Sequence, residues 1–462
     1  MTIFEYLAKH AKENPDKISL ISPKYKLTYE ELYKTIAYNQ SHLNFDSNKS
    51  VILKMVNQTD YTLNLLVLLS MGLWVVPIPP ASSESELAKI KSVVGDSIII
   101  DDENNPITIN YDTTETLKQI DGDKAGIYHM TSGSTGEPKF CVRSINNLTV
   151  EGESYRETLN LSASDKILNL PPLYHSYALG AACIAGIVSG SAIYAMDKFI
   201  PRKAMDLIHN EKPTIMILVP FMVKMMATTY ISQQKDFSSL RIALAGSGKI
   251  NKETYQLFVE RFKLPLMCNY GSTETGGLIT RLLPEPFDAI GKPMAGVECK
   301  LVDEEGKLVK QGAEGEVWIK TAAMLKEYLN NNSLYLDDDG FYNMNDIGVQ
   351  DEEGNYYIKR RKKSIINIAG KKVNPLEVEE VLLEYPGVKD CIVLGFTRDN
   401  GNEAVKAVVA VSKEVTEGDL RKYCHLKLSQ IKVPSKFELC SSIPRNELGK
   451  VKYDLVKEKN HE

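Results

Sequence analysis

Short runs of β-branched and apolar residues alternate with helical patterns over the first 285 residues of the chain. Strands that alternate with helices in this way form βαβ units, whose strands lie parallel in a sheet with helices on its faces. The chain is therefore expected to fold as an α/β protein with mostly parallel sheets. The expected strands are residues 18–21, 51–55, 97–100, 127–130, 214–219 and 241–245.

From about residue 290 the sequence changes to a pattern of β-hairpins. Turns rich in acidic residues and glycine, at residues 303–306 and 351–354, separate runs that alternate apolar and polar side chains. Such turns between alternating runs are typical of antiparallel strands. We therefore expect a β-rich subdomain at the end of the large α/β region.

A charged run at residues 359–364 separates these hairpins from a new order of helix, two strands, helix and strand. We place a domain boundary there. The expected architecture is a large N-terminal domain over residues 1–362, with mostly parallel sheets and a β-rich subdomain, followed by a small α+β C-terminal domain over residues 363–462.

The composition excludes several classes of function. The chain of 462 residues has a formal net charge of -5, and its Lys and Arg residues are dispersed apart from residues 359–363. No nucleic-acid partner is therefore expected. The 7 cysteines are odd in number and form no C-x-x-C pair. This argues against a disulfide framework or a zinc site and favours a reducing, cytoplasmic location.

Two stretches without charge, residues 61–80 and 178–196, are long enough to be considered as membrane spans. The first has the pattern of a helix that ends at Gly72 and is followed by a strand. The second is interrupted by glycines between Gly180 and Gly190. Both are therefore expected to be buried core segments, and no membrane span is predicted.

A loop rich in glycine, serine and threonine follows the expected strand at residues 127–130. Its small residues let successive backbone N–H groups turn inward, its hydroxyls add hydrogen-bond donors, and Lys139 supplies a positive charge, so the loop can bind a polyphosphate. It does not match the Walker A pattern, and an ordinary surface loop fits the same residues. The candidate phosphate-binding residues are Thr131, Ser132, Gly133, Ser134, Thr135, Gly136 and Lys139.

A second polar segment, residues 269–277, follows another expected strand. Tyr270 offers a face for a nucleotide base, Thr273 a hydroxyl for a phosphate, and Glu274 an oxygen ligand for Mg²⁺ that is held mostly by substrate phosphates. A polar turn with a structural tyrosine fits the same residues. Further along the chain, Asp346 can accept both hydroxyls of a ribose, or it can be a turn aspartate.

In order and spacing, these segments resemble the motifs of the adenylate-forming superfamily, which includes acyl-CoA synthetases, carrier-protein adenylation domains and firefly luciferases. The resemblance covers nearly the whole chain. It implies that the loop ending in Lys139 binds the phosphates of ATP, and that the second segment holds adenine, the α-phosphate and Mg²⁺. The residues that match this segment and the family's ribose-binding pair are Asn269, Tyr270, Gly271, Thr273, Glu274, Asp346 and Arg361.

The resemblance extends to the C-terminal part of the chain. Lys363 and Ser364 fall at the family's hinge. The stretch around Gly370 resembles the loop at the start of the family's small, mobile domain, which forms the thiol tunnel. Near the chain end, the pattern P-x-x-x-x-G-K ends in Lys450, which matches the family's catalytic lysine. A lysine there would stabilise the charge that develops between the acyl oxygen and pyrophosphate. Without the resemblance, Lys450 would be interpreted as a solvated lysine.

His175 lies where many family members that take aryl or fatty acids have a histidine or an aromatic residue beside the acyl pocket. Members that activate amino acids usually have an aspartate near this position, and this chain has no acidic residue between Asp165 and Asp197. An amino acid substrate is therefore disfavoured. A histidine in an apolar stretch is equally often a buried core residue, so both interpretations of His175 stay open.

The resemblance implies an enzyme that uses ATP and Mg²⁺ to activate a fatty or aryl carboxylic acid as an acyl-adenylate, and then transfers the acyl group to the thiol of coenzyme A. Its candidate catalytic residues are Lys450 and His175. A phosphopantetheinylated carrier protein is the alternative acceptor. A luciferase-like monooxygenase shares the same motifs, whereas a non-catalytic nucleotide-binding protein would be expected to have lost Lys450, Glu274 or the phosphate loop.

Overall fold

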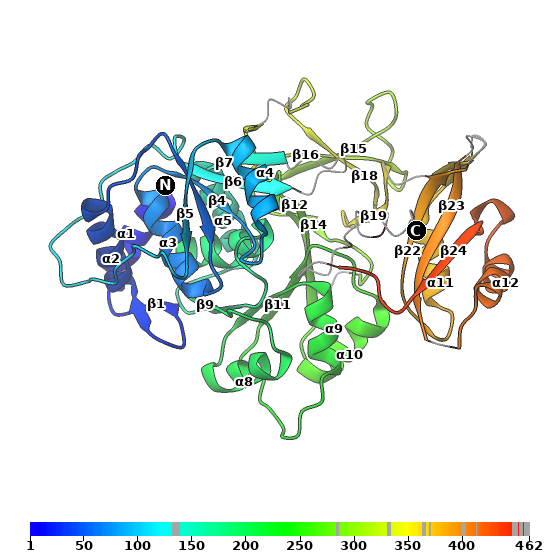
Figure 1. Cartoon of the computed structure of the whole chain (residues 1–462), viewed down its shortest axis with the longest axis horizontal. Helices are drawn as coiled ribbons and strands as arrows, with labels where there is room; N and C mark the ends of the chain where they lie inside the picture. The colour runs from blue at the N-terminus through cyan, green and yellow to red at the C-terminus, as the bar shows by residue number, and fades with distance from the viewer. Residues whose placement is uncertain are drawn as a thin grey trace. The chain divides into compact units, whose positions relative to one another are not determined.

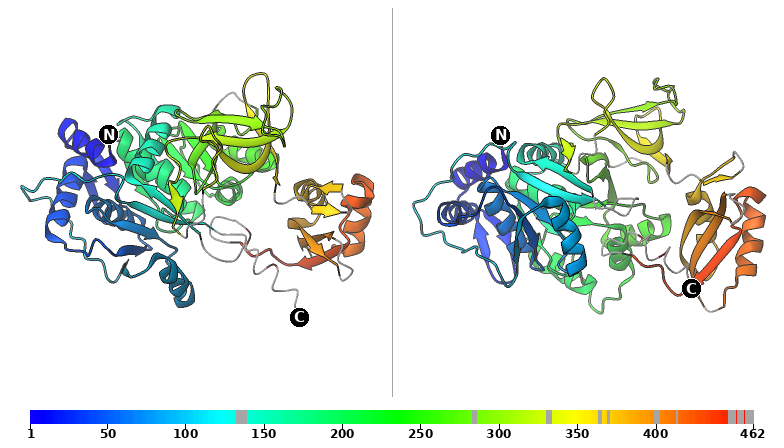
Figure 2. Two further views of the ribbon diagram at one scale, coloured as in Figure 1. Left: turned by 90° about the horizontal axis from the view of Figure 1, so that it is seen from above. Right: turned by 45° about the horizontal axis from the view of Figure 1, so that its top comes forward.

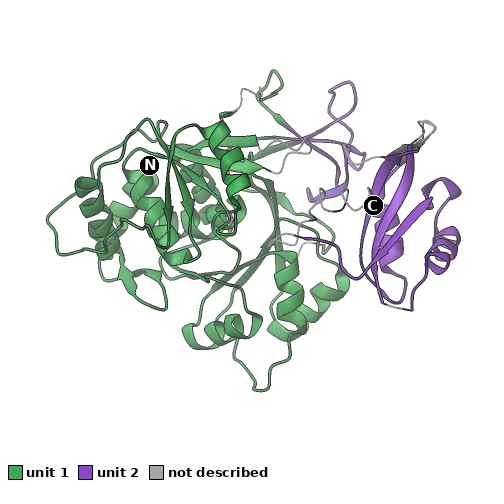
Figure 3. Ribbon diagram, in the orientation of Figure 1, with its two compact units in different colours: residues 1–299, 319–342 green, residues 300–318, 343–462 purple. Residues whose placement is uncertain are grey.

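The chain divides into two compact units, Met1–Cys299 with Ile319–Tyr342, and Lys300–Trp318 with Asn343–Glu462 (Figure 3). No helix in the described part of the chain combines the length and the apolar character needed to cross a membrane. The predicted domain boundary near Lys363 lies outside the described residues and stays a prediction. The computed structural model (Figure 1) describes residues 1–131, 139–282, 286–329, 334–362, 366–368, 371–398, 403–412, 414–445, 451 and 456.

The larger sheet of the first unit has nine strands, of which six consecutive neighbours, from β12 to β1, run parallel. The antiparallel strands β13, β14 and β2 extend its two edges. This arrangement confirms the predicted α/β fold. The strands in spatial order are β14 (Lys292–Pro293), β13 (Gly276–Arg281), β12 (Leu266–Ser272), β11 (Ile242–Gly246), β10 (Ile215–Leu218), β8 (Lys166–Asn169), β9 (Ala192–Ala195), β1 (Ile18–Ile21) and β2 (Lys26–Thr28).

The second sheet of this unit has six strands. Four of them run parallel, β7 lies antiparallel to β6, and the two-residue strand β17 lies antiparallel to β7. The hairpin of β6 and β7 brackets the predicted phosphate loop, so this sheet carries both ends of that loop. The strands in spatial order are β17 (Glu327–Tyr328), β7 (Lys139–Ser144), β6 (Gly126–Thr131), β4 (Trp74–Pro77), β3 (Ser50–Lys54) and β5 (Ser97–Asp101).

Helix α3 (Gln58–Ser70) is buried at every residue except Asp60, because its sequence is apolar on nearly all sides. Core residues of both sheets pack with it, among them Leu20 and Ile193 from the larger sheet and Val51 and Val75 from the smaller one. The two stretches without charge are therefore core, as predicted: the first forms α3 and β4, and the second forms α6, η1, α7 and β9. The other helices of this unit are α1 (Ile3–Glu13), α2 (Tyr29–His42), α4 (Glu84–Val94), α5 (Ile145–Thr158), α6 (Ser176–Ala178), the π-helical turn η1 (Leu179–Ile184), α7 (Ala185–Ser189), α8 (Pro201–Glu211), α9 (Pro220–Thr228) and α10 (Lys252–Phe262).

The second unit contains the predicted hairpins and the C-terminal α+β pattern. The hairpin strands form a four-stranded sheet, and the C-terminal residues form a two-stranded and a three-stranded sheet with two helices. Helices α11 and α12 contribute to one apolar cluster on one face of the three-stranded sheet (Figure 2). The elements are β15 (Glu298–Val302), β16 (Gly315–Lys320), β18 (Tyr342–Gln350), β19 (Tyr356–Arg361), β20 (Ile366–Ile368), β21 (Lys371–Val373), α11 (Pro375–Leu383), β22 (Val388–Thr397), β23 (Glu403–Val411), α12 (Glu417–Lys427), the 3₁₀ turn η3 (Gln430–Lys432) and β24 (Lys436–Cys440).

Glu379 is a half-buried carboxylate between α11 and β22, where its Oε1 accepts a hydrogen bond of 2.8 Å from the backbone N–H of Val393. Burial raises the pKa of Glu379 from 4.5 to about 7, and the hydrogen bond from Val393 and the nearby Arg445 oppose this only in part. The folded protein therefore keeps a proton on Glu379 at pH values where the unfolded chain has released it. The contribution of protonated Glu379 to stability is complete below pH 4.5 and is lost as the pH rises to about 7.

We therefore expect Glu379→Gln, which mimics the neutral acid, to become more stabilising relative to the wild type as the pH rises. The difference in unfolding free energy between the two proteins should grow by on the order of 2 kcal/mol between pH 4.5 and pH 8. Urea unfolding at several pH values measures this difference. Glu380→Gln, at the exposed neighbouring position, controls for the loss of a negative charge. A difference for Glu379→Gln that is constant with pH would contradict the assignment.

Candidate active site

The segments that follow the parallel strands of the nine-stranded sheet all begin at the carboxyl ends of those strands. Gly246 at the end of β11 pairs in register with Asn269 of β12, and the stretch that contains His175 follows β8 in the same sheet. Ligands of open parallel sheets bind beyond the carboxyl ends of the strands. The predicted base-binding, metal-binding and acyl-pocket residues therefore lie at the edge where such a site is expected.

The turn between β12 and β13 carries the predicted phosphate and metal residues. A Cβ atom at Gly271 would lie 2.1 Å from the carbonyl oxygen of Gly276, so only glycine fits at this position. The hydroxyl of Ser176, the residue after His175, lies 3.5 Å from Thr273 Oγ1. The structure thus brings the His175 segment beside the predicted nucleotide segment.

The side chain of Asn269 is buried and bonded within the protein. Its Oδ1 accepts a hydrogen bond of 2.9 Å from the hydroxyl of Tyr155, and its Nδ2 donates one of 2.9 Å to Thr280 Oγ1. These contacts join α5, β12 and β13 directly below the turn. Tyr270, the predicted base-binding residue, follows in sequence and is half-buried.

Glu274 and Lys139 both contact Tyr328, a residue that sequence reasoning did not identify. The hydroxyl of Tyr328 donates a hydrogen bond of 3.2 Å to Glu274 Oε1, and the Nζ atom of Lys139 lies 5.7 Å from the centroid of the Tyr328 ring. The predicted metal ligand and the predicted phosphate-binding lysine are therefore held on one side chain. Tyr328 lies on the two-residue strand β17, so no local sequence pattern could reveal it.

Thr131 and Lys139 face each other across the β6–β7 hairpin, and Thr131 Oγ1 lies 3.5 Å from the carbonyl oxygen of Lys139. The two ends of the predicted phosphate loop are thus adjacent. The remaining predicted loop residues, which are Ser132, Gly133, Ser134, Thr135 and Gly136, lie outside the described residues, as do Gly370 and Lys450.

A fully buried ion pair lies behind these segments. Arg143 of β7 donates a hydrogen bond of 2.7 Å to Glu151 Oε2 of α5, and both side chains are 0% exposed. Arg143 also donates two hydrogen bonds, of 3.1 and 3.0 Å, to the carbonyl oxygen of Ala323. Glu151 Oε1 accepts a hydrogen bond of 3.1 Å from the backbone N–H of Gly277. The pair therefore joins four segments that surround the predicted site.

The glycines next to Glu151 make this arrangement possible. A Cβ atom at Gly180 of η1 would lie 2.1 Å from Glu151 Oε1, and a Cβ atom at Gly276 would lie 2.5 Å from the same carboxylate. Gly276 also has a φ of +72°, which disfavours other residues. The carboxylate of Glu151 thus occupies the space between η1 and the β12–β13 turn.

His129 on β6 is a second buried polar residue near this pair. Burial, with Arg143 and His175 as smaller contributions, lowers the pKa of His129 to about 3, so its imidazole is neutral at physiological pH. In the described part of the chain neither of its ring nitrogens has a hydrogen-bond partner. His175 itself is half-buried, with its ring 4.4 Å from that of Tyr174.

In the second unit, the predicted ribose-binding residues lie together. Asp346 on β18 and Arg361 on β19 are directly opposed in the antiparallel register, and Arg361 Nε donates a hydrogen bond of 3.3 Å to Asp346 Oδ1. The side chain of Asp346 is 6% exposed, whereas that of Arg361 is 71% exposed. The arginine therefore presents more surface than the aspartate to a bound molecule.

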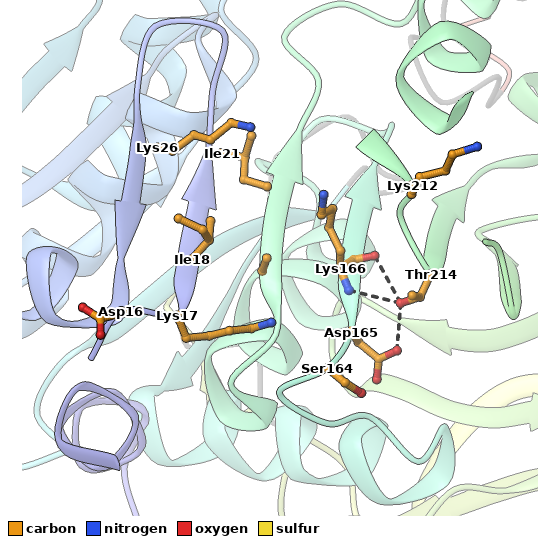
Figure 4. Close-up of a pocket in the computed structure, with 11 residues that line it drawn as sticks. Asp16, Lys17, Ile18, Ile21, Lys26, Ser164, Asp165, Lys166, Lys212 and Thr214 are labelled. Carbon is orange, nitrogen blue, oxygen red and sulfur yellow. Dashed lines mark hydrogen bonds between the residues drawn. The ribbon is translucent and has the colours of Figure 1, made fainter. Parts of the chain in front are cut away.

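A cavity of about 360 Å³ in the first unit is not part of this site (Figure 4). It lies at the amino ends of β1, β8, β9 and β10, which is the sheet edge opposite to the predicted site. Polar groups around it pair with each other: the hydroxyl of Thr214 donates to Asp165 Oδ1 at 2.7 Å, and Arg241 donates two hydrogen bonds to the same carboxylate. This cavity therefore lies away from the end of the sheet at which the nucleotide site is expected.

Comparison with protein families gives two matches. Residues 7–329 match the model of the AMP-binding enzyme family. Residues 377–450 match the model of the AMP-binding enzyme C-terminal domain. The two matches together include the described candidate residues of the first unit and the predicted catalytic lysine, Lys450.

Comparisons with curated proteins and with solved structures agree with these family matches. The chain is 27% identical to 4-coumarate–CoA ligase 1 of Arabidopsis thaliana, over 98% of this chain and 91% of that protein. It is 32% identical to the fatty acid–[acyl-carrier-protein] ligase ScoC of Streptomyces coeruleorubidus, over 70% of this chain and 64% of that protein. Among solved structures, ATP-bound MatB from Rhodopseudomonas palustris has a TM-score of 0.88 at 20% identity, with 99% of each chain covered. This likeness confirms the fold.

The buried pair of Arg143 and Glu151 generates a prediction about stability. Arg143→Met and Glu151→Gln each leave one uncompensated buried charge, so each is expected to lower the free energy of unfolding by about 3–5 kcal/mol. The double variant removes both charges and keeps an acceptor for the Gly277 N–H, so it is expected to recover more than half of that loss. Urea unfolding measures all three variants.

A partly exposed ion pair provides the control. Arg445 makes a bidentate contact with Asp390, at 2.8 and 2.7 Å, and its side chain is 34% exposed. Because solvent screens this pair, Arg445→Met is expected to cost less than about 1 kcal/mol. Additive losses in the Arg143→Met/Glu151→Gln double variant would contradict the coupling of these two residues.

Proposed function

Since the chain belongs to the family of AMP-binding enzymes, we propose that it activates a fatty or aryl carboxylic acid with ATP and transfers the acyl group to the thiol of coenzyme A. In the first step, a carboxylate oxygen bonds to the α-phosphorus of ATP while the bond to pyrophosphate breaks. In the second step, the thiol sulfur bonds to the acyl carbon, AMP leaves, and the thiol proton is released. The enzyme is thus an acid–thiol ligase of the AMP-forming type.

One observation supports this proposal above the others: a cationic and an anionic group converge on Tyr328. The ammonium of Lys139, at the exit of the predicted phosphate loop, and the carboxylate of Glu274 lie at the same aromatic side chain. The ammonium would bind phosphates, and the carboxylate would supply an oxygen ligand to a metal ion held with them. The pairing is the one expected for a metal-bound triphosphate.

The residues present fit a magnesium ion. Tyr328 engages only Oε1 of Glu274, and in the described part of the chain Oε2 has no hydrogen-bond partner. One carboxylate oxygen is therefore held in place while the other can bind a cation. Mg²⁺ is commonly bound by one or two carboxylates together with substrate phosphates. When bound, it would neutralise charge on the phosphates of ATP.

The nucleoside is assigned to Tyr270 for the base and to Asp346 and Arg361 for the ribose. Asp346 is held by Arg361, so the carboxylate has a defined orientation on β18. Lys450 is assigned to the transition state of the first step, where a positive charge between the acyl oxygen and the pyrophosphate lowers the barrier. His175, beside the predicted nucleotide segment, is assigned to the acyl pocket.

The acid is proposed to be fatty or aryl, because no acidic residue lies between Asp165 and Asp197 to pair with the ammonium of an amino acid. The similarity to 4-coumarate–CoA ligase 1 supports coenzyme A as the acceptor. The similarity to the ligase ScoC, whose name gives an acyl-carrier protein as acceptor, favours a carrier protein as the second candidate.

The proposal is tested by single-turnover mass spectrometry of the purified protein with ATP, Mg²⁺ and a pool of aryl, short-chain and long-chain acids. We expect an acyl-adenylate that becomes an acyl-CoA only when coenzyme A is added. An adenylate that persists with coenzyme A but is consumed by a phosphopantetheinylated carrier protein would favour the second candidate. Absence of any adenylate would contradict the proposed function.

Lys450→Ala is expected to lower the rate of acyl-adenylate formation by at least about 100-fold, because the charge of Lys450 is assigned to that transition state. Thioester formation from a synthetic acyl-adenylate is expected to change less than about threefold. Rapid-quench kinetics of the two half-reactions measure this difference. Lys436→Ala, an exposed lysine of β24, is the matched control. Equal losses in both half-reactions would contradict the role of Lys450.

A further inference from the structure

We propose that Tyr328 is a positioning residue, which fixes the Glu274 carboxylate and the Lys139 ammonium relative to each other so that they receive a metal-bound triphosphate together. The inference rests on the proposed function, because it concerns the roles assigned there to Glu274 and Lys139. It adds a residue that belongs to neither the phosphate loop nor the β12–β13 turn.

The backbone around Tyr328 is fixed to β7, the strand that begins at Lys139. Tyr328 pairs in register with Cys141. Lys326 N donates a hydrogen bond of 3.1 Å to the carbonyl oxygen of Val142, and Leu329 N donates one of 2.9 Å to that of Phe140. These bonds set the Tyr328 ring beside the strand, and Lys139 Nζ lies 5.7 Å from the ring centroid, within the range of a cation–π contact.

The same segment is bonded to the β12–β13 turn. Leu325 N donates a hydrogen bond of 2.7 Å to the carbonyl oxygen of Glu274, so the backbone of Glu274 is held as well as its side chain. Tyr328 then reaches the carboxylate through its hydroxyl, at 3.2 Å. Residues 325–329 therefore bridge the two motifs that sequence analysis identified separately.

The hydroxyl of Tyr328 has one chemical role here. The phenol O–H donates this hydrogen bond to the carboxylate of Glu274. The hydroxyl of Tyr342 lies 3.5 Å from that of Tyr328. With one oxygen of Glu274 held by this donor, the direction of the other oxygen is also defined.

This geometry implies a specific effect on metal use. A glutamate that binds a cation through one oxygen loses conformational freedom on binding, and a donor that already fixes the other oxygen reduces that cost. Tyr328 is therefore expected to act on the affinity for Mg²⁺ and ATP. The acid, which is assigned to the pocket near His175, is not expected to respond.

Tyr328→Phe removes one oxygen atom and keeps the ring beside Lys139. We expect the dissociation constant of Mg²⁺ in the presence of ATP, measured by isothermal titration calorimetry, and the Mg²⁺ concentration for half-maximal adenylate formation each to rise about tenfold, with the KM for the acid changed less than twofold. Tyr328→Leu removes the ring as well, and we expect a further two- to fivefold rise in the KM for ATP. The single-atom variant decides the question even where the leucine variant does not fold.

Two further variants make the outcome unambiguous. Tyr25→Phe removes a comparable tyrosine–carboxylate hydrogen bond, of 2.7 Å to Asp60, away from the site and is expected to change neither constant. Glu274→Gln is expected to impair adenylate formation. If Glu274→Gln is impaired and Tyr328→Phe needs no more Mg²⁺ than the wild type, the role of Tyr328 is wrong. If Glu274→Gln forms the adenylate normally, the metal assignment in the proposed function is wrong.

Discussion

The ion pair between Arg143 and Glu151 is the contact on which the geometry of the candidate site depends. It lies at 0% exposure between β7 and α5, and its remaining hydrogen bonds go to backbone atoms of Ala323 and Gly277. In the sequence, Ala323 comes just before the Tyr328 segment, and Gly277 comes just after the Glu274 turn. The strand that leaves the phosphate loop is thereby joined to both of these segments.

A buried ion pair is not needed for stability as such, since apolar residues of similar volume are often as stable. What apolar residues cannot do is satisfy the backbone N–H of Gly277 and the carbonyl oxygen of Ala323, which would each cost free energy if buried without a partner. Glu151 also fills the space left by Gly180 and Gly276, where a Cβ atom would collide with its carboxylate. The pair thus specifies how closely these segments approach.

Sequence reasoning reached the fold and the local motifs because both depend on short-range patterns. The run of Ile18–Ile21 forms a strand as expected. The phosphate and metal roles of Lys139 and Glu274 stay predictions, and both side chains contact Tyr328. Tyr328 and Glu151 could not be found in this way. Their importance comes from pairing between strands and helices far apart in the chain, which spacing within a motif does not encode.

The turn motif that contains Glu274 shows how structural and chemical roles are divided within one short segment. Asn269 is bonded inside the protein, and Gly271 is required by the close approach of Gly276. These residues hold the turn that carries Thr273 and Glu274, to which the phosphate and metal roles are assigned. A chain could keep the chemistry-bearing residues and still lose the site if the turn changed. The motif therefore contains residues that hold the turn as well as residues to which the chemistry is assigned.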